Sequence, residues 1–597
     1  YDWFFIAPAL GSFVSVAGIV FAVSRRWRFS LLSALLLFLT VFIASKAKFA
    51  LVAMNLHVYD AIFYPTSPAQ VEFLFSAYPR IAWAITAALC VVAVALAAAW
   101  RVDSPAICGR ARLAAAGLSC LVMAVAAAPL AGRNGMFFTE NRFIFSAFVS
   151  SFADLPQLVR FKGLIEVSAA PAAPAQPMDG IVCKPATTPP DIVFFLNESA
   201  MPPGVYPSLV YPDELKDFFA GPDGRVRPMR VETFGGGTWL TDFSALTGLS
   251  THSFGSMRNF VANFMTGRLR HSLPQYLAAC GYETTMIYPA SAGFAGVGRF
   301  YEAIGFDRII DISVHKAPDQ RQRDAFYLAE VAKILEANAA SARPRPQFVM
   351  ASSMSTHSPW DYRFAPEAVR ETDHLRWNAD PEFDEYLWRL VVARRDRDAF
   401  RARLAASLPQ RRILHVGFGD HQPALARLPL EGAQAIANTG GDWQLDPASK
   451  AFETYYRIDG QNFTPVPPAR DYPIVEVAHL ATLISAFDPR QKNPTVFQKT
   501  VAINDYYLAS PRSPYPLGQI QSQGRTHGVM AQIVVPWIPL WAYEAWVARG
   551  VDWLAMTEDL PLEENRVTLA PDGRIRLQYR PNNVRAHERL VKEATRM

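Results

Sequence analysis

Four long apolar stretches near the N-terminus constrain most strongly what this chain can fold into. They cover residues 3–23, 29–45, 81–100 and 113–130 and carry almost no charged side chains. Crossing the hydrocarbon core of a bilayer, about 30 Å thick, takes roughly 20 apolar residues in a helix. We therefore predict four membrane-spanning helices, the short second one continuing through Lys46 and Lys48 if these side chains reach the interface. A helical bundle buried in a soluble protein is the alternative, and so many uncharged stretches in so short a region argue against it.

The basic residues between these stretches predict the orientation of the chain. Three arginines lie within residues 25–28, after the first stretch, and three more within residues 101–112, between the third and the fourth. Alternating spans place both loops on one side of the membrane, and an excess of arginine marks the cytoplasmic side. We therefore expect a multi-pass protein of the bacterial inner membrane, with everything after the fourth span on the periplasmic side.

Charge and cysteine content narrow the class of protein further. The net charge of +5 is small for 597 residues and is scattered along the chain, so we expect no nucleic-acid partner. Five cysteines are too few for a disulfide scaffold. Cys183 and Cys280 lie in the polar part of the chain. They form a disulfide in an oxidising compartment or remain two free thiols.

The rest of the chain alternates short apolar runs with helical patterns. DIVFFL, ETTMIY, QFVMASS and RILHVGF have the length and composition of buried strands. This alternation predicts an α/β domain with a mixed, mostly parallel sheet between helices. The whole chain then divides into a transmembrane helical domain (1–132), interfacial helices with a Pro/Ala linker (133–188), an extracytoplasmic catalytic domain (189–487) and an appended segment (488–597).

Chemically capable side chains follow several of these predicted strands, where α/β sheets hold their ligands. The candidates are Glu198 in FFLNES, His357 in STHSPW, Asp420 and His421 in FGDHQP, and Thr238 after a triple-glycine turn. Two carboxylates, an imidazole and a hydroxyl suit Mn²⁺, Zn²⁺ or Mg²⁺. A metal on the threonine oxygen would make it a nucleophile. Each residue alone also has an ordinary explanation as a loop or turn residue, and their joint placement at strand ends favours a site.

Other residues near these motifs are weaker candidates. Asp242 and Ser244 follow the threonine, and helix capping explains them as well as catalysis does. His252 could bind a substrate headgroup, although a surface role is more typical. Arg299 could contact a phosphate. His415 lies inside an apolar strand, which is typical of a structural histidine.

Through these motifs, residues 189–486 resemble the sulfatase-like branch of the alkaline phosphatase superfamily. Within that branch the chain is most similar to lipoteichoic acid synthases and periplasmic phosphoglycerol transferases. NES, GGGTWLTDF, STHSPW and FGDHQP, with LPQYLAACGYETTMIY and FYEAIGFD between them, carry the resemblance in order and spacing. Such proteins usually have five membrane spans, so the four predicted here lead us to expect a further span before Tyr1.

The resemblance implies a reaction and a role for each residue. Glu198, Thr238, Asp420 and His421 would hold one metal, Mn²⁺ or Zn²⁺ with Mg²⁺ as a further option. Thr238 would attack the headgroup phosphate of a phospholipid donor, phosphatidylglycerol or phosphatidylethanolamine, and form a phosphothreonine intermediate. His357 would bind the transferred group, and a glycan or lipid of the cell envelope would accept it.

Several alternatives remain open. Phosphoethanolamine transferases tend to be rich in periplasmic disulfides, so the two cysteines available here favour phosphoglycerol transfer slightly. A sulfatase or phosphodiesterase-type hydrolase shares the same superfamily, but sulfatases need a C/S-x-P-x-R motif, and Thr238 is followed by Trp239 and Leu240. A non-catalytic scaffold with a vestigial metal site fits poorly with the intact set of ligands.

The C-terminal segment has a different resemblance. Residues from about 488 onward, including QGRTHGVMAQIVVPW and NRVTLAPDGRIRLQY, resemble an internal fragment of glucose-methanol-choline oxidoreductases. Those enzymes need a dinucleotide-binding fingerprint, and no G-x-G-x-x-G follows a predicted strand in this chain. We therefore expect no flavin and no redox activity.

Overall fold

The structure is a computed structural model of the chain, and it divides into two compact units, residues 1–494 and 495–597. It describes residues 2–52, 54–63, 68–77, 79–105, 109, 111–127, 143–155, 189–269, 272–431, 448–465 and 475–479, and short stretches at 502–503, 519–522, 553–556, 566–569, 575–578 and 587–591. The predicted linker and the predicted boundary at residue 488 lie outside these residues. The predicted domain limits therefore stay a prediction.

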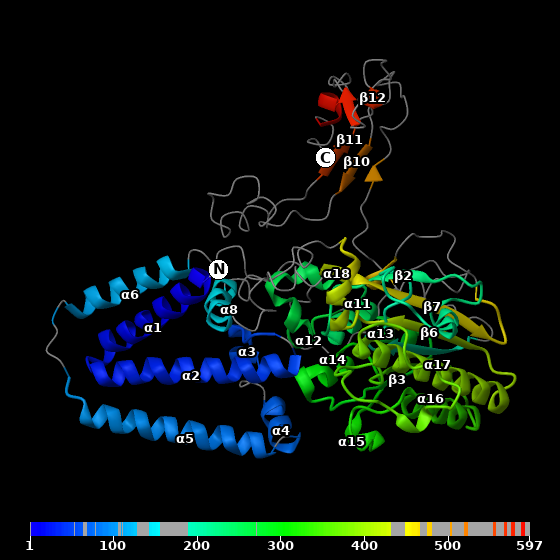
Figure 1. The fold of residues 1–597 in the computed structure, drawn as a ribbon, viewed down its shortest axis with the longest axis horizontal. Coiled ribbons are helices and arrows are strands. Elements are labelled where there is room, and N and C mark those ends of the chain that lie inside the picture. Colours follow the sequence, from blue (N-terminus) through cyan, green and yellow to red (C-terminus); the bar gives the residue numbers. More distant parts are fainter. Residues whose placement is uncertain are drawn as a thin grey trace. The chain divides into compact units, whose positions relative to one another are not determined.

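Apolar helices form the N-terminal region. They are α1 (Asp2–Ser24), α2 (Trp27–Val52), α5 (Pro79–Val102) and α6 (Ala111–Ala127). Figure 1 shows them lying side by side, and α1 contacts both α2 and α6. Among the described residues, three helices are long and apolar enough to cross a membrane, within α1, α2 and α5, whereas the fourth predicted span forms the shorter α6. Large apolar side chains such as Trp83 and Val94 are exposed on α5, as a lipid-facing surface requires.

Short helices lie between α2 and α5 and after α6. They are α3 (Val58–Phe63), α4 (Pro68–Ala77) and α8 (Ile144–Ser151), with a 3₁₀ turn at Phe152–Asp154. His57 Nε2 lies 3.2 Å from a carboxylate oxygen of Asp154, and the Tyr59 hydroxyl donates to the Asp154 carbonyl at 2.6 Å. The Tyr59 ring also packs edge-on against Phe260 of the sheet domain, with ring centres 5.5 Å apart. Buried polar and aromatic contacts thus join the two parts of this unit.

An eight-stranded sheet is the centre of the α/β domain. Its order is β4 (Arg308–Ile310), β3 (Glu283–Ile287), β5 (Gln347–Ser352), β1 (Asp191–Asn197), β6 (Ile413–Gly419), β7 (Glu453–Gln461), β2 (Arg227–Arg230) and β8 (Val475–Glu476). The first five strands in this order are parallel, and β7 runs antiparallel to both of its neighbours. The predicted fold class is confirmed: apolar helices precede an α/β domain with a mixed, mostly parallel sheet.

Helices cover both faces of this sheet because side chains of β1 alternate between two apolar cores. Ile192, Phe194 and Leu196 pack with α11 (Thr238–Thr247), α13 (Leu273–Ala279) and α14 (Val297–Ala303). Val193 and Phe195 pack with α16 (Asp324–Ala339) and α17 (Pro381–Ser407). A period of two residues explains the division. The remaining short helices are α10 (Lys216–Phe219), α12 (Val261–Phe264), α15 (Ile312–His315) and α18 (Arg427–Glu431).

The C-terminal unit contains short antiparallel strands where it is described. β9 (Ala502–Ile503), β10 (Gln519–Ser522) and β11 (Trp553–Met556) form one small sheet. β12 (Arg566–Leu569) and β13 (Ile575–Gln578) form a second. The resemblance of this segment to a fragment of an oxidoreductase stays a prediction.

A buried ion pair at the start of β1 is expected to stabilise the sheet. The Asp191 carboxylate is fully buried and accepts hydrogen bonds from Arg411 Nε at 2.6 Å, Arg411 Nη2 at 2.8 Å and the Gln347 amide at 2.8 Å. Asp191→Ala leaves the guanidinium and the amide without their acceptor, so we expect a loss of about 3 kcal/mol. The measurement is thermal unfolding of the full chain in detergent, followed by circular dichroism.

The matched control removes an exposed pair. Glu336→Ala breaks the contact with Arg403, whose side chain is 44% exposed, and should cost less than about 1 kcal/mol. A Tm that falls equally in both variants would contradict the role given to burial.

Candidate functional site

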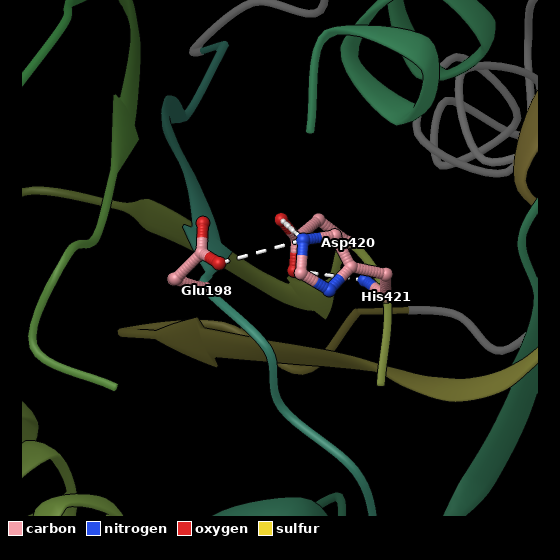
Figure 2. Close-up of side chains that lie close together, drawn as sticks. All are labelled: Glu198, Asp420 and His421. Carbon is pink, nitrogen blue, oxygen red and sulfur yellow. Dashed lines mark hydrogen bonds and ion pairs between the residues drawn. The ribbon is translucent and has the colours of Figure 1, made fainter. Parts of the chain in front are cut away.

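The predicted catalytic side chains meet at the carboxyl ends of two neighbouring strands. β1 and β6 are parallel and in register, with Asn197 opposite Gly419. The next residues along each strand, Glu198 and Asp420, are therefore neighbours, and both are buried. Figure 2 shows the carboxylates of both residues beside the imidazole of His421. The register of two strands thus brings residues together that are more than two hundred positions apart.

Thr238 joins this cluster as the first residue of α11. The preceding Gly235, Gly236 and Gly237 all have positive φ angles, of 67°, 150° and 87°. A Cβ on Gly237 would lie 2.8 Å from Thr233 Oγ1, so a larger residue would be strained here by both φ and contact. The turn directs Thr238 Oγ1 to within 2.8 Å of Asp420 Oδ2 and 3.2 Å of Glu198 Oε2.

Hydrogen bonds hold both carboxylates in place. Asp420 Oδ1 accepts from the backbone amides of Ser199 at 2.7 Å and His421 at 2.8 Å, which leaves Oδ2 to face the threonine. The Ser199 hydroxyl donates to Glu198 Oε1 at 2.8 Å. The sequence analysis missed Ser199, and its only signal there is its position directly after Glu198.

His421 has one ring nitrogen without a partner. Its Nδ1 lies 2.9 Å from the Gln422 carbonyl, so Nδ1 carries the proton and donates it there. The opposite nitrogen, Nε2, is buried and makes no hydrogen bond, although Asp420 Oδ2 lies 3.2 Å and Glu198 Oε1 3.4 Å away. A lone pair that faces two carboxylates is unfavourable unless a cation lies between them.

The pKa values of the cluster residues also indicate that the cluster requires a cation. Burial raises the pKa of Asp420 to about 8, and the negative charge of Glu198 adds to this effect. Burial also opposes ionisation of Glu198, but attraction to His421 and His357 and the hydrogen bond from Ser199 lower its pKa overall. For His421 burial opposes the charged form, whereas Asp420 and Glu198 raise its pKa. The cluster therefore favours added positive charge.

These residues fit a divalent metal. One ligand atom each from Glu198, Asp420 and His421 lies within 4.8 Å of the others, and no second such group of three occurs in the part of the chain that the structure describes. The donors are carboxylate oxygens, one imidazole nitrogen and the Thr238 hydroxyl. Mn²⁺, Zn²⁺ and Mg²⁺ accept such donors. The buried and unpartnered Nε2 of His421 is the observation that makes the fit specific.

His357 lies close to the cluster but, in the part of the chain that the structure describes, makes no hydrogen bond or ion pair with its carboxylates. It follows β5, and its Nδ1 lies 2.7 Å from the Ser358 carbonyl, which leaves Nε2 for another partner. The hydroxyl of Thr356, the residue before it, donates to the Glu198 carbonyl, which brings this loop beside the cluster. Buried Arg389 holds this loop by donating to the carbonyls of His357 at 2.7 Å and Pro359 at 2.9 Å. No sequence motif marked Arg389 in the middle of α17.

The weaker candidates make no hydrogen bond to this cluster in the described residues. Asp242 and Ser244 do not cap a helix, because both are buried inside α11 and Gly237 is its N-cap. Asp242 accepts a hydrogen bond from the Tyr301 hydroxyl at 2.6 Å, and Ser244 donates to Glu232 at 3.2 Å. His252 is exposed beside Arg258. Arg299 lines a separate hollow with Glu302 and Asp311, and no residue of the cluster belongs to that lining.

Comparison with known proteins gives one matching family model. Residues 230–445 match the family model described as Sulfatase. This match confirms the predicted resemblance to the sulfatase-like branch of the alkaline phosphatase superfamily. Thr238, His357, Asp420 and His421 fall inside the match, whereas Glu198 lies before it and is placed in the cluster by the structure.

A curated relative shares only a distant sequence similarity with this chain. An uncharacterized protein of Haemophilus influenzae is 25% identical over 255 residues, which cover 40% of this chain and 44% of that protein. The chain therefore spans less than half the length of this relative.

Solved structures with a similar fold come from several bacteria. Lipooligosaccharide phosphoethanolamine transferase A from Neisseria meningitidis aligns with 79% of this chain and 86% of its own, at 12% identity and a TM-score of 0.46. Phosphoglycerol transferase GacH from Streptococcus pyogenes aligns with 52% of this chain and 81% of its own (16%, TM-score 0.36). Lipoteichoic acid synthase LtaP from Listeria monocytogenes aligns with 55% and 76% (18%, TM-score 0.35). Because these TM-scores are low, the resemblance to the sulfatase family rests on the family-model match over residues 230–445.

The contact from Ser199 to Glu198 gives a test of the proposed metal site that leaves every ligand in place. Ser199→Ala removes a hydrogen bond that orients the carboxylate, and such supporting contacts are typically worth a tenfold or larger change in metal affinity. We expect the affinity of the full chain for Mn²⁺ or Zn²⁺ to fall about tenfold, measured by competition with a fluorescent chelator.

The control is Ser407→Ala, which removes a hydroxyl bonded to Glu336 at the exposed end of α17. Its metal affinity should equal that of the parent chain. Equal affinities in all three proteins would contradict a metal bound by Glu198.

Proposed function

We propose that this chain is a membrane-anchored, metal-dependent phosphotransferase that moves a phospholipid headgroup to a glycan or lipid of the cell envelope. The observation that carries the proposal is the Thr238 hydroxyl at the start of a helix, hydrogen-bonded to two buried carboxylates beside the unpartnered Nε2 of His421. A hydroxyl in this position is suited to attack phosphorus, whereas a structural threonine has no need of two buried acids.

The metal would be held by Glu198, Asp420, His421 and the Thr238 oxygen. Mn²⁺ or Zn²⁺ is favoured, and Mg²⁺ is a further option. When bound, the cation lowers the pKa of the threonine hydroxyl and offsets the charge of a phosphoryl group. The protein supplies the positioning. Asp420 Oδ2 already accepts the hydrogen bond of the hydroxyl at 2.8 Å and is the nearest base for its proton.

The proposed first step transfers the headgroup to the protein. Thr238 Oγ1 forms a bond to the headgroup phosphorus, and the bond from phosphorus to the diacylglycerol oxygen breaks. The first amides of α11 and the positive end of its dipole lie beside the phosphoryl oxygens. Diacylglycerol leaves after its oxygen takes up a proton, and His357, with Nε2 free of its neighbouring loop, is the proposed donor.

The proposed second step reverses the chemistry with a new hydroxyl. The acceptor oxygen bonds to phosphorus, the Thr238 oxygen is released, and the proton of the acceptor returns to the protein. Because the phosphothreonine separates donor from acceptor, the site binds the two lipids or glycans in turn. Phosphoglycerol is the favoured group, and phosphoethanolamine is the alternative.

The location of the site supports a lipid donor and an extracytoplasmic domain. Apolar helices long enough to span a membrane precede the domain, and the arginine-rich loops predict its periplasmic side. Cys280 is disulfide-bonded, whereas Cys90 and Cys120 on the apolar helices are free. A disulfide in the soluble domain is expected outside the reducing cytoplasm. Cys183, its predicted partner, lies outside the described residues.

A covalent adduct tests this proposal. The full chain in detergent is incubated with Mn²⁺ and either phosphatidylglycerol or phosphatidylethanolamine, and its intact mass is measured. We expect the added mass of phosphoglycerol, located on Thr238 by peptide mapping, because no acceptor is present to remove it. Thr238→Ala should carry no adduct.

The matched control is Thr247→Ala on the same helix, whose hydroxyl donates to the Phe243 carbonyl at 2.6 Å and has no contact with the cluster. It should form the adduct at the parent rate. An added phosphoethanolamine mass would assign the alternative donor. Release of phosphate or sulfate from soluble esters without an adduct would instead support a hydrolase.

A further inference from the structure

A cavity of about 50 Å³ lies within the catalytic domain, between the sheet and the helices α16 and α17. Its lining comes from β1, β6 and β7 and from these helices, and includes Asn197, Asp324, His415 and Asp459. One water needs roughly 10–15 Å³ of such space, so the cavity has room for a group of several heavy atoms. No residue of the cluster around Thr238 lines it.

Three arginines line this cavity. Arg397 and Arg401 lie one turn apart on α17, and Arg457 lies on β7. Two of these arginines share Asp459, because its carboxylate pairs with Arg401 and lies 3.3 Å from Arg457 Nη2. Arg397 pairs with Asp398, which is 43% exposed and does not line the cavity, and its Nη1 also donates to the carbonyls of Asp217 and Phe218. Three guanidinium groups therefore share one fully ionised carboxylate of the lining.

The second acid of the lining offsets little of this charge. Asp324 is buried and accepts a hydrogen bond from the Ser353 hydroxyl. Burial raises the pKa of Asp324 to about 7, so near neutral pH it carries only part of a negative charge. The surroundings of the cavity are thus cationic.

Two hydrogen-bonding groups at the cavity have no partner. Arg457 Nε is buried and lacks an acceptor. The ring of His415 makes no hydrogen bond to any described residue, and it packs edge-on against Phe400. Burial, with repulsion from Arg401, Arg457 and Arg397, lowers the pKa of His415 to about 3, so the ring is neutral and offers one N–H. Guanidinium groups that share one carboxylate of the lining and leave a buried Nε without an acceptor are unfavourable unless an anion completes the site.

We propose that this cavity is a binding site for a small free oxyanion, such as inorganic phosphate or sulfate, held by Arg397, Arg401, Arg457 and His415. Planar guanidinium groups recognise tetrahedral and planar oxyanions through paired N–H donors. The side chains of the three arginines are 21%, 28% and 14% exposed, which leaves an entrance for an ion. The small volume excludes a lipid headgroup with its attached glycerol.

The position of the site connects it to the strands that carry the catalytic residues. Val193, Phe195 and Asn197 of β1 line the cavity, whereas Glu198, the next residue, turns to the other side of the strand. Gly417 of β6 lines it as well, three residues before Asp420. A bound anion would therefore stabilise β1 and β6 from behind the cluster.

Thermal unfolding tests this site in the full chain in detergent. Inorganic phosphate is titrated at constant ionic strength against chloride, with EDTA present and in a Glu198→Gln background, so that the metal cluster contributes nothing. We expect phosphate to raise the Tm, and Arg457→Gln to weaken the apparent affinity about tenfold or more because a charged donor is lost. The control Arg403→Gln removes the same charge from the exposed side of α17 and should keep the parent affinity.

A phosphate effect that is absent, or equal in Arg457→Gln and Arg403→Gln, would overturn the proposal. If Arg457→Gln does not fold, anomalous diffraction from crystals of the full chain with selenate gives the second readout. A selenium peak between Arg457 and His415 supports the site, and selenium only elsewhere overturns it. The unfolding arm disables the metal cluster and the crystal arm locates the anion directly, so the result is independent of the phosphotransferase proposal.

Discussion

The burial of two carboxylates and an imidazole at the ends of two adjacent strands is the constraint on which the rest of this structure depends. The register of β1 and β6 makes Glu198 and Asp420 neighbours, and neither has access to solvent. Buried acids so close together are costly unless their charge is balanced. The unpartnered Nε2 of His421 and the raised pKa of Asp420 are two consequences of the same imbalance. A divalent cation resolves both, so stability and chemistry at this site have one physical origin.

The glycine turn and the loop after β5 arrange the remaining groups around this cluster. Three successive positive φ angles bring the chain into α11 so that Thr238 faces Asp420. On the other side, Thr356 donates to the Glu198 carbonyl and buried Arg389 holds the carbonyls of His357 and Pro359. Rigid support of this kind keeps the proposed nucleophile, Thr238, and the imidazole of His357 in position before a substrate binds. The cavity behind β1 has the opposite charge imbalance: its lining has an excess of arginine, whose positive charge an anion would balance.

Much of this arrangement could be predicted from sequence because strong local patterns carry it. Buried β-rich runs predicted β1, β3, β5 and β6, and polar residues directly after them predicted Glu198, Asp420 and His421 at one edge of the sheet. Contacts between distant residues left no such pattern. Arg389 looks like any charged residue of a long helix, and a strand pattern cannot reveal the cavity beside His415. Asp242 and Ser244 resembled caps because Gly237, the actual N-cap, has no side-chain signal.

The central claim, that the cluster holds a metal in contact with the Thr238 oxygen, is tested most directly by anomalous diffraction from crystals of the full chain grown with Mn²⁺. The account predicts a single strong manganese peak bounded by Glu198, Asp420 and His421, about 2.0–2.3 Å from their ligand atoms and from Thr238 Oγ1. A cluster without manganese at saturating concentration, or a metal bound there with the Thr238 oxygen turned away, would contradict it.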